Sequence, residues 1–410
     1  MSPQKKKQKP EQISQEKKTS RSVLLGAAFL MATSSIGPGF LTQTTVFTQQ
    51  LAASFAFVIL ISLLLDVFAQ INVWRIIAVT GLRGQEIANK VLPGLGVILA
   101  ILIVLGGLAF NIGNIAGAGL GLNAMLGLNP IHGAMISAIF AILIFTIKEA
   151  SKAMDKVVQI AGFIMILLML YVAFKTFPPV GEVIINTVKP EEISIYAIIT
   201  LVGGTVGGYI TFAGGHRLLD AGIKGKNNLP LVTKSSITGI AVTGVMRVAL
   251  FLAVLGVISQ GLTINPTNPP ASVFQLAVGD IGYRLFGVIM WAAAITSVVG
   301  AAYTSVSFIR SFSPFIEKYH NWITILFIII STTTFTFIGE PVQMLVLVGA
   351  LNALILPLAL GTILVAANMK KMVGTYKHPL WLTVTGSIVV IMMGFLGIIT
   401  LIEQIPLIFQ

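Results

Sequence analysis

The chain is dominated by apolar segments that are long enough to cross a lipid bilayer as helices. A helix needs about 20 apolar residues to span the hydrocarbon core. Only 10% of the residues are charged, whereas ordinary soluble domains carry about 25%. We therefore predict an all-α membrane protein with eleven transmembrane helices, near residues 22–49, 52–79, 94–124, 130–149, 155–177, 193–215, 235–259, 283–308, 321–338, 341–367 and 380–403.

Positive charge alternates between the loops. The net charge is +12, and much of it lies in residues 1–21, which we interpret as a basic cytoplasmic tail. Loops on one side of the predicted membrane carry most of the other basic residues, namely Arg83, Lys90, Lys148, Lys152, Arg217, Lys224, Lys226, Arg310, Lys318, Lys370, Lys371 and Lys377. The opposite loops contribute little beyond Lys175 and Lys189. Because cytoplasmic loops are enriched in Lys and Arg, we expect a multi-pass plasma-membrane protein with its N-terminus inside and its C-terminus outside. We attribute the net positive charge to membrane topology. We therefore expect the lipid bilayer, and not a nucleic acid, as a partner.

Motifs for catalysis are absent from the sequence. It contains no cysteine and only four histidines, which leaves no Cys-based metal site and no evident nucleophile–base arrangement. The phosphate-binding pattern G-x-x-x-x-G-K-[ST] is also missing. We therefore expect neither an enzyme nor an ATP-driven pump, and no cofactor.

Two of the predicted spans are interrupted by glycine. Gly37-Pro38-Gly39-Phe40 breaks the first span, and Gly203-Gly204-Thr205-Val206-Gly207-Gly208-Tyr209 breaks the sixth. Glycine pairs can serve only as helix contact surfaces. Non-helical backbone at mid-membrane, however, is tolerated only where protein or a water-filled cavity satisfies it. Breaks five spans apart are typical of transporters with an inverted repeat, so we predict repeats at 22–178 and 193–367, followed by an extra helix at 380–403.

Several segments resemble the NRAMP family of divalent-metal transporters, which have the LeuT-like fold. Gly37-Pro38-Gly39-Phe40 stands where that family has Asp-Pro-Gly-Asn, and Leu356-Pro357-Leu-Ala-Leu resembles its tenth-helix Leu-Pro-Phe-Ala-Leu. The third-span segment 109–123 is similar to the family's Asp-Ile-Ala-Glu-Val-Ile-Gly-Ala. The resemblance covers most of the chain and implies a broken first and sixth helix.

The positions that the resemblance assigns to metal ligands have lost their donor groups. Gly37 and Phe40 replace the Asp and Asn of the first helix. In the sixth helix, Gly207, Gly208 and Tyr209 take the places of the family's Met-Pro-His. A second register, through Gly214-Gly215-His216, keeps the histidine but also puts glycine in the place of methionine. The family's metal site is therefore not reproduced.

Few ionisable side chains remain inside the predicted membrane. Asn111 and Asn114 stand where the resemblance implies an acidic pair that moves protons, and asparagine does not titrate. Arg247 lies midway along the seventh span, where an arginine is costly without an anionic partner. That partner is either Asp66 or helix carbonyls, in a structural role, or an anionic substrate. Asp66 is a structural partner or a proton carrier, and His216 is an interfacial hydrogen-bonding residue or a gate.

Half-helix ends favour the binding of anions, and glycines allow a ligand to approach the backbone. We predict a secondary transporter of a small organic carboxylate or amino-acid derivative, with Na⁺ or H⁺ as a possible coupling ion. The resemblance also suggests 5-oxoproline. A Mg²⁺ or Mn²⁺ transporter and a non-transporting sensor or scaffold are the alternatives. The predicted substrate-binding residues are Ser34, Gly37, Gly39, Phe40, Gln43, Gly207, Gly208, Tyr209 and Arg247. The predicted coupling or gating residues are Asp66, Asn111, Asn114 and His216.

Overall fold

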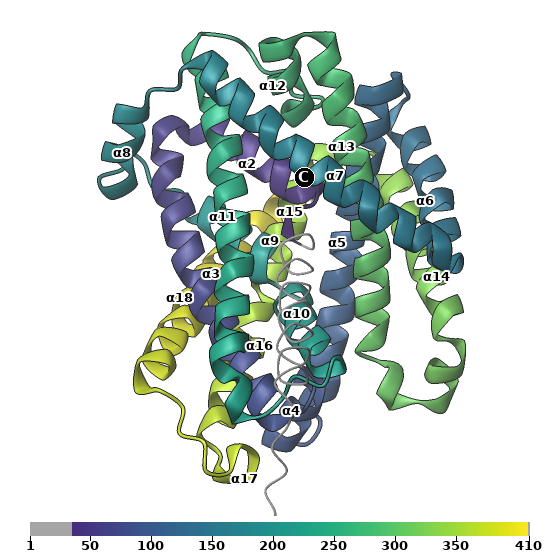
Figure 1. Ribbon diagram of the computed structural model, residues 1–410, viewed down its shortest axis with the longest axis vertical. Helices are drawn as coiled ribbons and strands as arrows, with labels where there is room; N and C mark the ends of the chain where they lie inside the picture. The colour runs from purple at the N-terminus through teal and green to yellow at the C-terminus, as the bar shows by residue number, and fades with distance from the viewer. Residues whose placement is uncertain (1–34, 409–410) are drawn as a thin grey trace, which may run out of the picture.

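A computed structural model describes residues 35–408, and every regular element in that range is a helix (Figure 1). Residues 1–34, which include the predicted basic tail and Ser34, lie outside the described part. The elements of the first half are α2 (Pro38–Leu51), η1 (Ala52–Ser54), α3 (Phe55–Thr80), α4 (Gly84–Val91), α5 (Leu95–Leu126), α6 (Pro130–Thr146), α7 (Lys148–Thr176), α8 (Val180–Val188), α9 (Ile195–Val206) and α10 (Ile210–Asp220). Those of the second half are η2 (Lys226–Asn228), α11 (Leu229–Ser259), α12 (Pro269–Val278), α13 (Asp280–Ser307), η3 (Arg310–Phe312), α14 (Pro314–Ile338), α15 (Pro341–Ala353), α16 (Ile355–Asn368), α17 (Lys370–Val373) and α18 (Leu380–Ile408).

Each predicted span from 52–79 onwards corresponds to a helix or to a broken pair of helices, and α2 covers the described part of the first span. Within residues 35–408, eight helical stretches are long and apolar enough to cross a membrane, or nine if α7 and α8, which are bent by 108° relative to each other, form one span. The shorter apolar helix α6 adds a further candidate. One of the eight stretches, Pro38–Thr80, contains parts of two predicted spans, so the structure is compatible with eleven spans.

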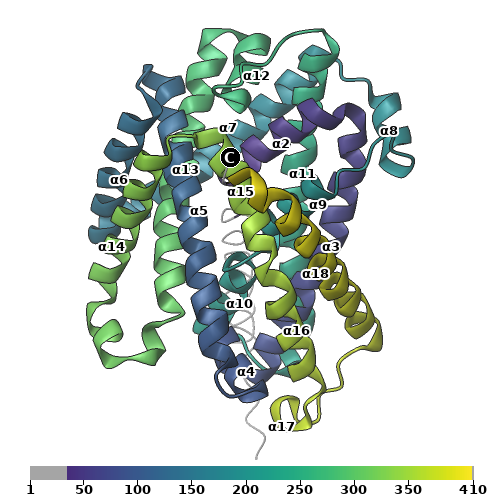
Figure 2. The same ribbon diagram turned by 180° about the vertical axis from the view of Figure 1, so that it is seen from behind.

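The bundle is surrounded by outward-facing apolar side chains. Phe337 is 87% exposed and Phe174 is 75% exposed, which suits a surface in contact with lipid rather than with water. In Figures 1 and 2, α6 and α14 cover one flank of the bundle and α18 covers the opposite flank. Helices α2, α9 and α10 lie between them (Figure 1). The two broken spans therefore occupy the interior.

Glycines let the inner helices approach one another closely. A Cβ atom placed on Gly203 in α9 would lie 1.9 Å from the carbonyl oxygen of Gly349 in α15. A Cβ on Gly121 in α5 would lie 2.7 Å from the backbone nitrogen of Trp291 in α13. Small residues at helix contacts are the usual basis of packing inside membranes. The glycine content thus supports packing as well as the breaks.

The segment between α17 and α18 is held to α3 by a hydrogen-bonded histidine. The His378 Nε2 atom lies 2.8 Å from Oδ1 of Asn72, and its Nδ1 lies 3.1 Å from the Tyr376 hydroxyl. This arrangement suits a neutral ring that donates through Nε2 and accepts through Nδ1. Burial, together with the nearby charge of Arg75, lowers the pKa of His378 from 6.5 to about 4.

We expect the folded protein to lose stability as the pH falls from 7 towards 4. The unfolded chain takes up a proton at His378 near pH 6.5, whereas the folded state resists it down to about pH 4. The contribution of His378 to the free energy of unfolding is thus fully present above pH 6.5 and is lost as the pH falls below it. Thermal melting of the purified protein at pH 7, 6 and 5 measures this effect, and His378→Gln should flatten the profile. An identical pH profile in that variant would contradict the assignment.

Candidate functional site

The first break lies at the start of α2. Gly37 caps the helix with extended backbone dihedral angles, and no side chain of residues 35–408 caps its free N–H groups. Pro38, the first helical residue, packs against α5 at Gly117, where a Cβ atom would lie only 2.0 Å from the proline ring. The positive end of the α2 dipole is therefore buried at this break.

The second break separates α9 from α10. Helix α9 ends at Val206, Gly207 is extended, Gly208 has a φ of +53°, and α10 begins at Ile210. The break therefore includes Tyr209 and selects the first of the two sequence registers. Gly214 and Gly215 lie within α10, where Gly214 packs against Trp74 instead of interrupting the helix.

The Gly207 position has no room for a side chain. A Cβ atom there would lie 2.4 Å from the carbonyl oxygen of Gly203 and 2.8 Å from that of Asn352. A thioether ligand at this position is therefore excluded by sterics as well as by sequence. Tyr209 is buried and makes an edge contact with the Phe110 ring at 5.8 Å, which places its ring against α5.

The two breaks are joined directly. The Ser35 hydroxyl donates a hydrogen bond of 3.0 Å to the carbonyl oxygen of Thr205, in the last turn of α9. Gln43, one turn beyond Gly39 in α2, donates to the carbonyl oxygen of Leu345 at 2.8 Å and packs against Gly204. Gln43 thus lies in the interface of α2, α9 and α15, which suits a packing role, although its Oε1 atom has no hydrogen-bond partner among the described residues.

Arg247 in α11 is the most unusual residue at the breaks. Its side chain is fully buried, and its guanidinium carbon lies 4.4 Å from the centre of the Phe40 ring, in the first turn of α2. Within residues 35–408, none of its three side-chain nitrogens has a hydrogen-bond partner. The ring contact contributes about 2 kcal/mol when it is desolvated, which does not replace the hydrogen bonds that a guanidinium makes in water.

Asp66 in α3 supplies the opposite charge. It is fully buried and interacts electrostatically with Arg247 and with the Thr205 side chain. Both of its oxygens lack a hydrogen-bond partner, and the ion pairs of the described region do not include it. The expected structural pairing of Asp66 with Arg247 is therefore not a contact pair in this conformation.

The two asparagines of α5 have different surroundings. Asn114 is buried beside the first break, where its Oδ1 atom would lie 3.5 Å from a Cβ on Gly37, and its Nδ2 has no hydrogen-bond partner in the described part of the chain. Asn111 instead donates to the Ser331 hydroxyl in α14 at 3.1 Å. The structure thus brings Asn114 to the breaks, whereas Asn111 faces away from them.

Three polar residues that the sequence analysis did not select also lie at the breaks. The Ser297 hydroxyl in α13 would lie 3.2 Å from a Cβ on Gly37. Asn352 in α15 donates to Gly106 and leaves its Oδ1 against Gly208, and Thr205 lies beside Asp66. Ser297 and Asn352 come from spans without a glycine break, so only the tertiary fold identifies them. We call Gly37, Phe40, Asp66, Asn114, Thr205, Arg247 and Ser297 the break site.

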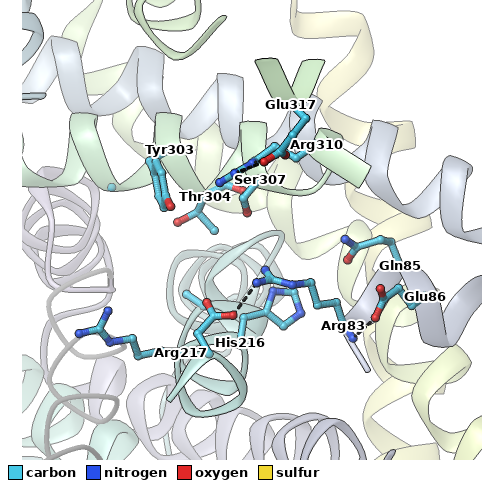
Figure 3. Close-up of a pocket in the computed structure, with 13 residues that line it drawn as sticks. Arg83, Gln85, Glu86, His216, Arg217, Tyr303, Thr304, Ser307, Arg310 and Glu317 are labelled. Carbon is cyan, nitrogen blue, oxygen red and sulfur yellow. Dashed lines mark hydrogen bonds and ion pairs between the residues drawn. The ribbon is translucent and has the colours of Figure 1, made fainter. Parts of the chain in front are cut away.

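A cavity of about 660 Å³ lies between α10 and α13 (Figure 3). These helices meet there near the end of the bundle that carries α4 and α17 (Figure 1). Tyr303, Thr304 and Ser307 line one wall, across from Arg83 and His216 (Figure 3). Gly300 also lines it and lies three residues, about 4.5 Å along the helix, from Ser297. The cavity therefore approaches the break site to within one helical turn.

Two contacts connect α10 to the loop before α4 beside this cavity. Arg83 forms an ion pair of 2.5 Å with Asp220 (Figure 3). Nε2 of His216 accepts a hydrogen bond from the Gly84 backbone N–H at 3.1 Å, and its ring packs between Phe212 and Phe308. A doubly protonated histidine has no free acceptor, so this bond requires the neutral ring. The geometry favours the interfacial role over a proton-sensing one.

The break site holds one carboxylate, one guanidinium and several neutral polar groups. Across the described residues, no cluster of three or more His, Cys, Asp or Glu side chains is arranged to bind a metal ion. Unpartnered donors, namely the Arg247 nitrogens and Asn114 Nδ2, lie on the side of the first break. The arrangement can therefore hold an anionic group between Arg247 and the amino end of α2.

The chain matches a known protein family and two close relatives over most of its length. A family model described as natural resistance-associated macrophage protein-like matches residues 28–403. The uncharacterized membrane protein YcsG of Bacillus subtilis is 68% identical over 400 residues, covering 96% of this chain and 99% of that protein. An uncharacterized membrane protein of Haemophilus influenzae is 57% identical over 390 residues, covering 95% of this chain and 98% of its own.

Solved structures share the fold. A manganese transporter of Eremococcus coleocola superposes with a TM-score of 0.73 at 18% identity, covering 98% of this chain and 89% of that one. MhsT in complex with L-phenylalanine superposes with a TM-score of 0.59 at 15% identity, covering 92% and 97%. These similarities confirm the predicted LeuT-like fold. At identities of 15–18% they are evidence for the fold only.

Proposed function

Since this chain belongs to the natural resistance-associated macrophage protein-like family of membrane transporters, we propose that it is a secondary transporter whose substrate is a small organic acid bound at the break site. Family and fold indicate a transporter rather than an enzyme. The observation that carries the substrate class is the Arg247 guanidinium, which is fully buried beside the first break and whose three nitrogens have no hydrogen-bond partner among the described residues. A planar guanidinium binds a carboxylate through two parallel hydrogen bonds.

The surroundings of Arg247 support an anion rather than a divalent cation. The amino end of α2 adds a positive dipole beside it, and Asn114 adds an N–H₂ group near Gly37 that has no partner among residues 35–408. Divalent cations are usually held by carboxylates or by soft donors, and Asp66 is the single carboxylate of the break site. A guanidinium in the same buried space also repels a dication.

We propose that the cavity between α10 and α13 is the cytoplasmic vestibule of this site. It opens at the end of the bundle where Arg83, Arg217 and Arg310 lie, which the positive-inside rule assigns to the cytoplasm. Through Gly300 it leads towards Ser297 and the first break. Substrate would then move between this vestibule and the opposite face by alternating access, with Na⁺ or H⁺ as the coupling ion.

Transport of Mn²⁺ or Mg²⁺ is the second candidate function. Its support is the family membership and the structural likeness to a manganese transporter. In this chain the ligands would have to be Asp66, backbone carbonyls at the breaks and amide oxygens such as that of Asn352, which has no hydrogen-bond partner in the described region.

Transport by the purified protein in liposomes separates the two candidates. We expect saturable uptake of a small carboxylate, with 5-oxoproline and proline as the first probes, and no saturable uptake of Mn²⁺ or Mg²⁺. Saturable Mn²⁺ uptake that carboxylates do not inhibit would overturn the proposal in favour of the second candidate. If neither class of solute moves or raises the melting temperature, a sensor or scaffold role is favoured, because a ligand of the folded state must stabilise it.

Cysteine labelling tests the vestibule, because the natural chain has no cysteine. We expect Thr304→Cys, on the cavity wall, to react with a membrane-impermeant maleimide in inside-out vesicles and not in intact cells. Thr267→Cys, exposed in the loop between α11 and α12, is the matched control and should show the reverse pattern. Labelling of Thr304→Cys in intact cells would contradict the proposed orientation.

A further inference from the structure

An acidic and a basic side chain are buried at the break site without touching. Asp66 and Arg247 are both fully buried and interact electrostatically. Neither takes part in the ion pairs found between residues 35 and 408, and neither side chain has a hydrogen-bond partner there. A buried charge costs several kcal/mol unless it is paired and hydrogen-bonded. Neither group has that compensation among the described residues.

The half-helix ends beside these charges have matching signs. Arg247 lies against Phe40, in the first turn of α2, where the helix dipole is positive. Asp66 lies beside Thr205, in the last turn of α9, where the dipole is negative. Ser35, two residues before Gly37, links the chain at the first break to this turn of α9 through its hydrogen bond to Thr205. The break site therefore has a positive side at α2 and a negative side at α9.

We propose that the substrate carries a carboxylate and, a few Å from it, an N–H donor, so that it bridges Arg247 and Asp66. This inference rests on the proposed transport of an organic acid and defines its substrate class. The carboxylate binds the Arg247 guanidinium and the amino end of α2. The N–H group, either an ammonium or an amide, donates to the Asp66 carboxylate, and the bridging ligand supplies the partners that both buried charges lack.

Simpler ligands satisfy only half of this arrangement. A plain carboxylate pairs with Arg247 and leaves the Asp66 oxygens unpartnered, and an amide without an acid group does the opposite. A polar group that is buried without a hydrogen-bond partner has lost its bonds to water and gained none in return. Sites built to hydrogen-bond a substrate therefore strongly reject analogues that lack the matching group.

A series of five-membered rings tests this class on the full-length protein. Proline carries a carboxylate and an ammonium, 5-oxoproline a carboxylate and an amide N–H, cyclopentanecarboxylate only the acid, and 2-pyrrolidinone only the N–H. We expect proline or 5-oxoproline to bind at least about ten-fold more tightly than cyclopentanecarboxylate, and 2-pyrrolidinone more weakly still. The better of the first two identifies the N–H group as an ammonium or an amide.

Asp66→Asn should remove this preference, so that the ratio of the affinities for proline or 5-oxoproline and for cyclopentanecarboxylate falls towards one. Equal binding of all three acids by the natural protein would overturn the inference and leave the organic-acid proposal standing. Binding of none of them would overturn the proposed function itself. If Asp66→Asn does not fold, the ring series on the natural protein still decides between these outcomes.

Discussion

Replacing Arg247 with glutamine is expected to abolish binding and uptake of the carboxylate substrate. The guanidinium offers two parallel charge-assisted hydrogen bonds, and each contributes about 1.5–3 kcal/mol. We therefore expect affinity to fall on the order of 100-fold or more, measured as the ligand-induced rise in melting temperature and as uptake into liposomes. Arg247→Lys should retain part of the affinity, because it keeps the charge but not the planar fork.

The stability of the same variant distinguishes a substrate-binding arginine from a structural one. Removing one partner of a buried ion pair costs about 3–5 kcal/mol, because it leaves an uncompensated charge. Arg247 makes no contact pair in the described structure, and an unpaired buried charge is itself destabilising, so without ligand we expect the variant to melt at or above the temperature of the natural protein. If the melting temperature without ligand falls strongly and its ligand-induced rise is unchanged, Arg247 has a structural role with Asp66 and does not bind the substrate.

Arg75→Gln is the matched control for the loss of a membrane arginine. Arg75 donates to the Thr233 hydroxyl at 2.7 Å and to the Tyr376 hydroxyl at 3.2 Å, in the interface of α3, α11 and the segment before α18. Its loss should lower the melting temperature while leaving the ligand-induced shift intact. We therefore expect Arg247→Gln to affect ligand binding and Arg75→Gln to affect stability.

Gly203→Ala is expected to cause one of the largest losses of stability available from a single methyl group. The new Cβ atom would lie 1.9 Å from the Gly349 carbonyl oxygen and 2.6 Å from the Ala353 backbone nitrogen. Backbone atoms of α15 cannot rotate away as a side chain does, so α9 and α15 must separate. Overpacking of this kind costs about 1–3 kcal/mol or more, which thermal melting in detergent measures directly.

The control for this substitution is Gly162→Ala in α7. A Cβ atom on Gly162 has no neighbour within 4 Å, and alanine is about 1 kcal/mol more favourable than glycine in a helix interior. This variant should melt at the natural temperature or slightly above it. Equal melting of the two alanine variants would show that α9 and α15 are not held as closely as the structure describes.

The positions of the helices could be predicted from the sequence because they depend on local properties. Apolar length defines a span, and the glycines around Gly37 and Gly207 interrupt a helix wherever it packs. The third interruption, between α15 and α16, was not predicted, although Pro357 has no N–H to donate to Ala353, one turn earlier. The register of the sixth-span motif stayed open in the sequence, because both glycine pairs satisfy the same pattern, and the packing of Gly214 on Trp74 resolves it.

The sequence by itself determined that this chain crosses a membrane with two broken spans and lacks the metal-binding side chains its family resemblance implies. Only the tertiary structure decided that Arg247 lies over Phe40, that Asp66 faces it without pairing, and that Asn114 rather than Asn111 reaches the breaks. Ser35 and Thr205, which join the two breaks, are 170 residues apart. Contacts at such separations depend on how whole helices pack, and no local pattern of residues encodes that.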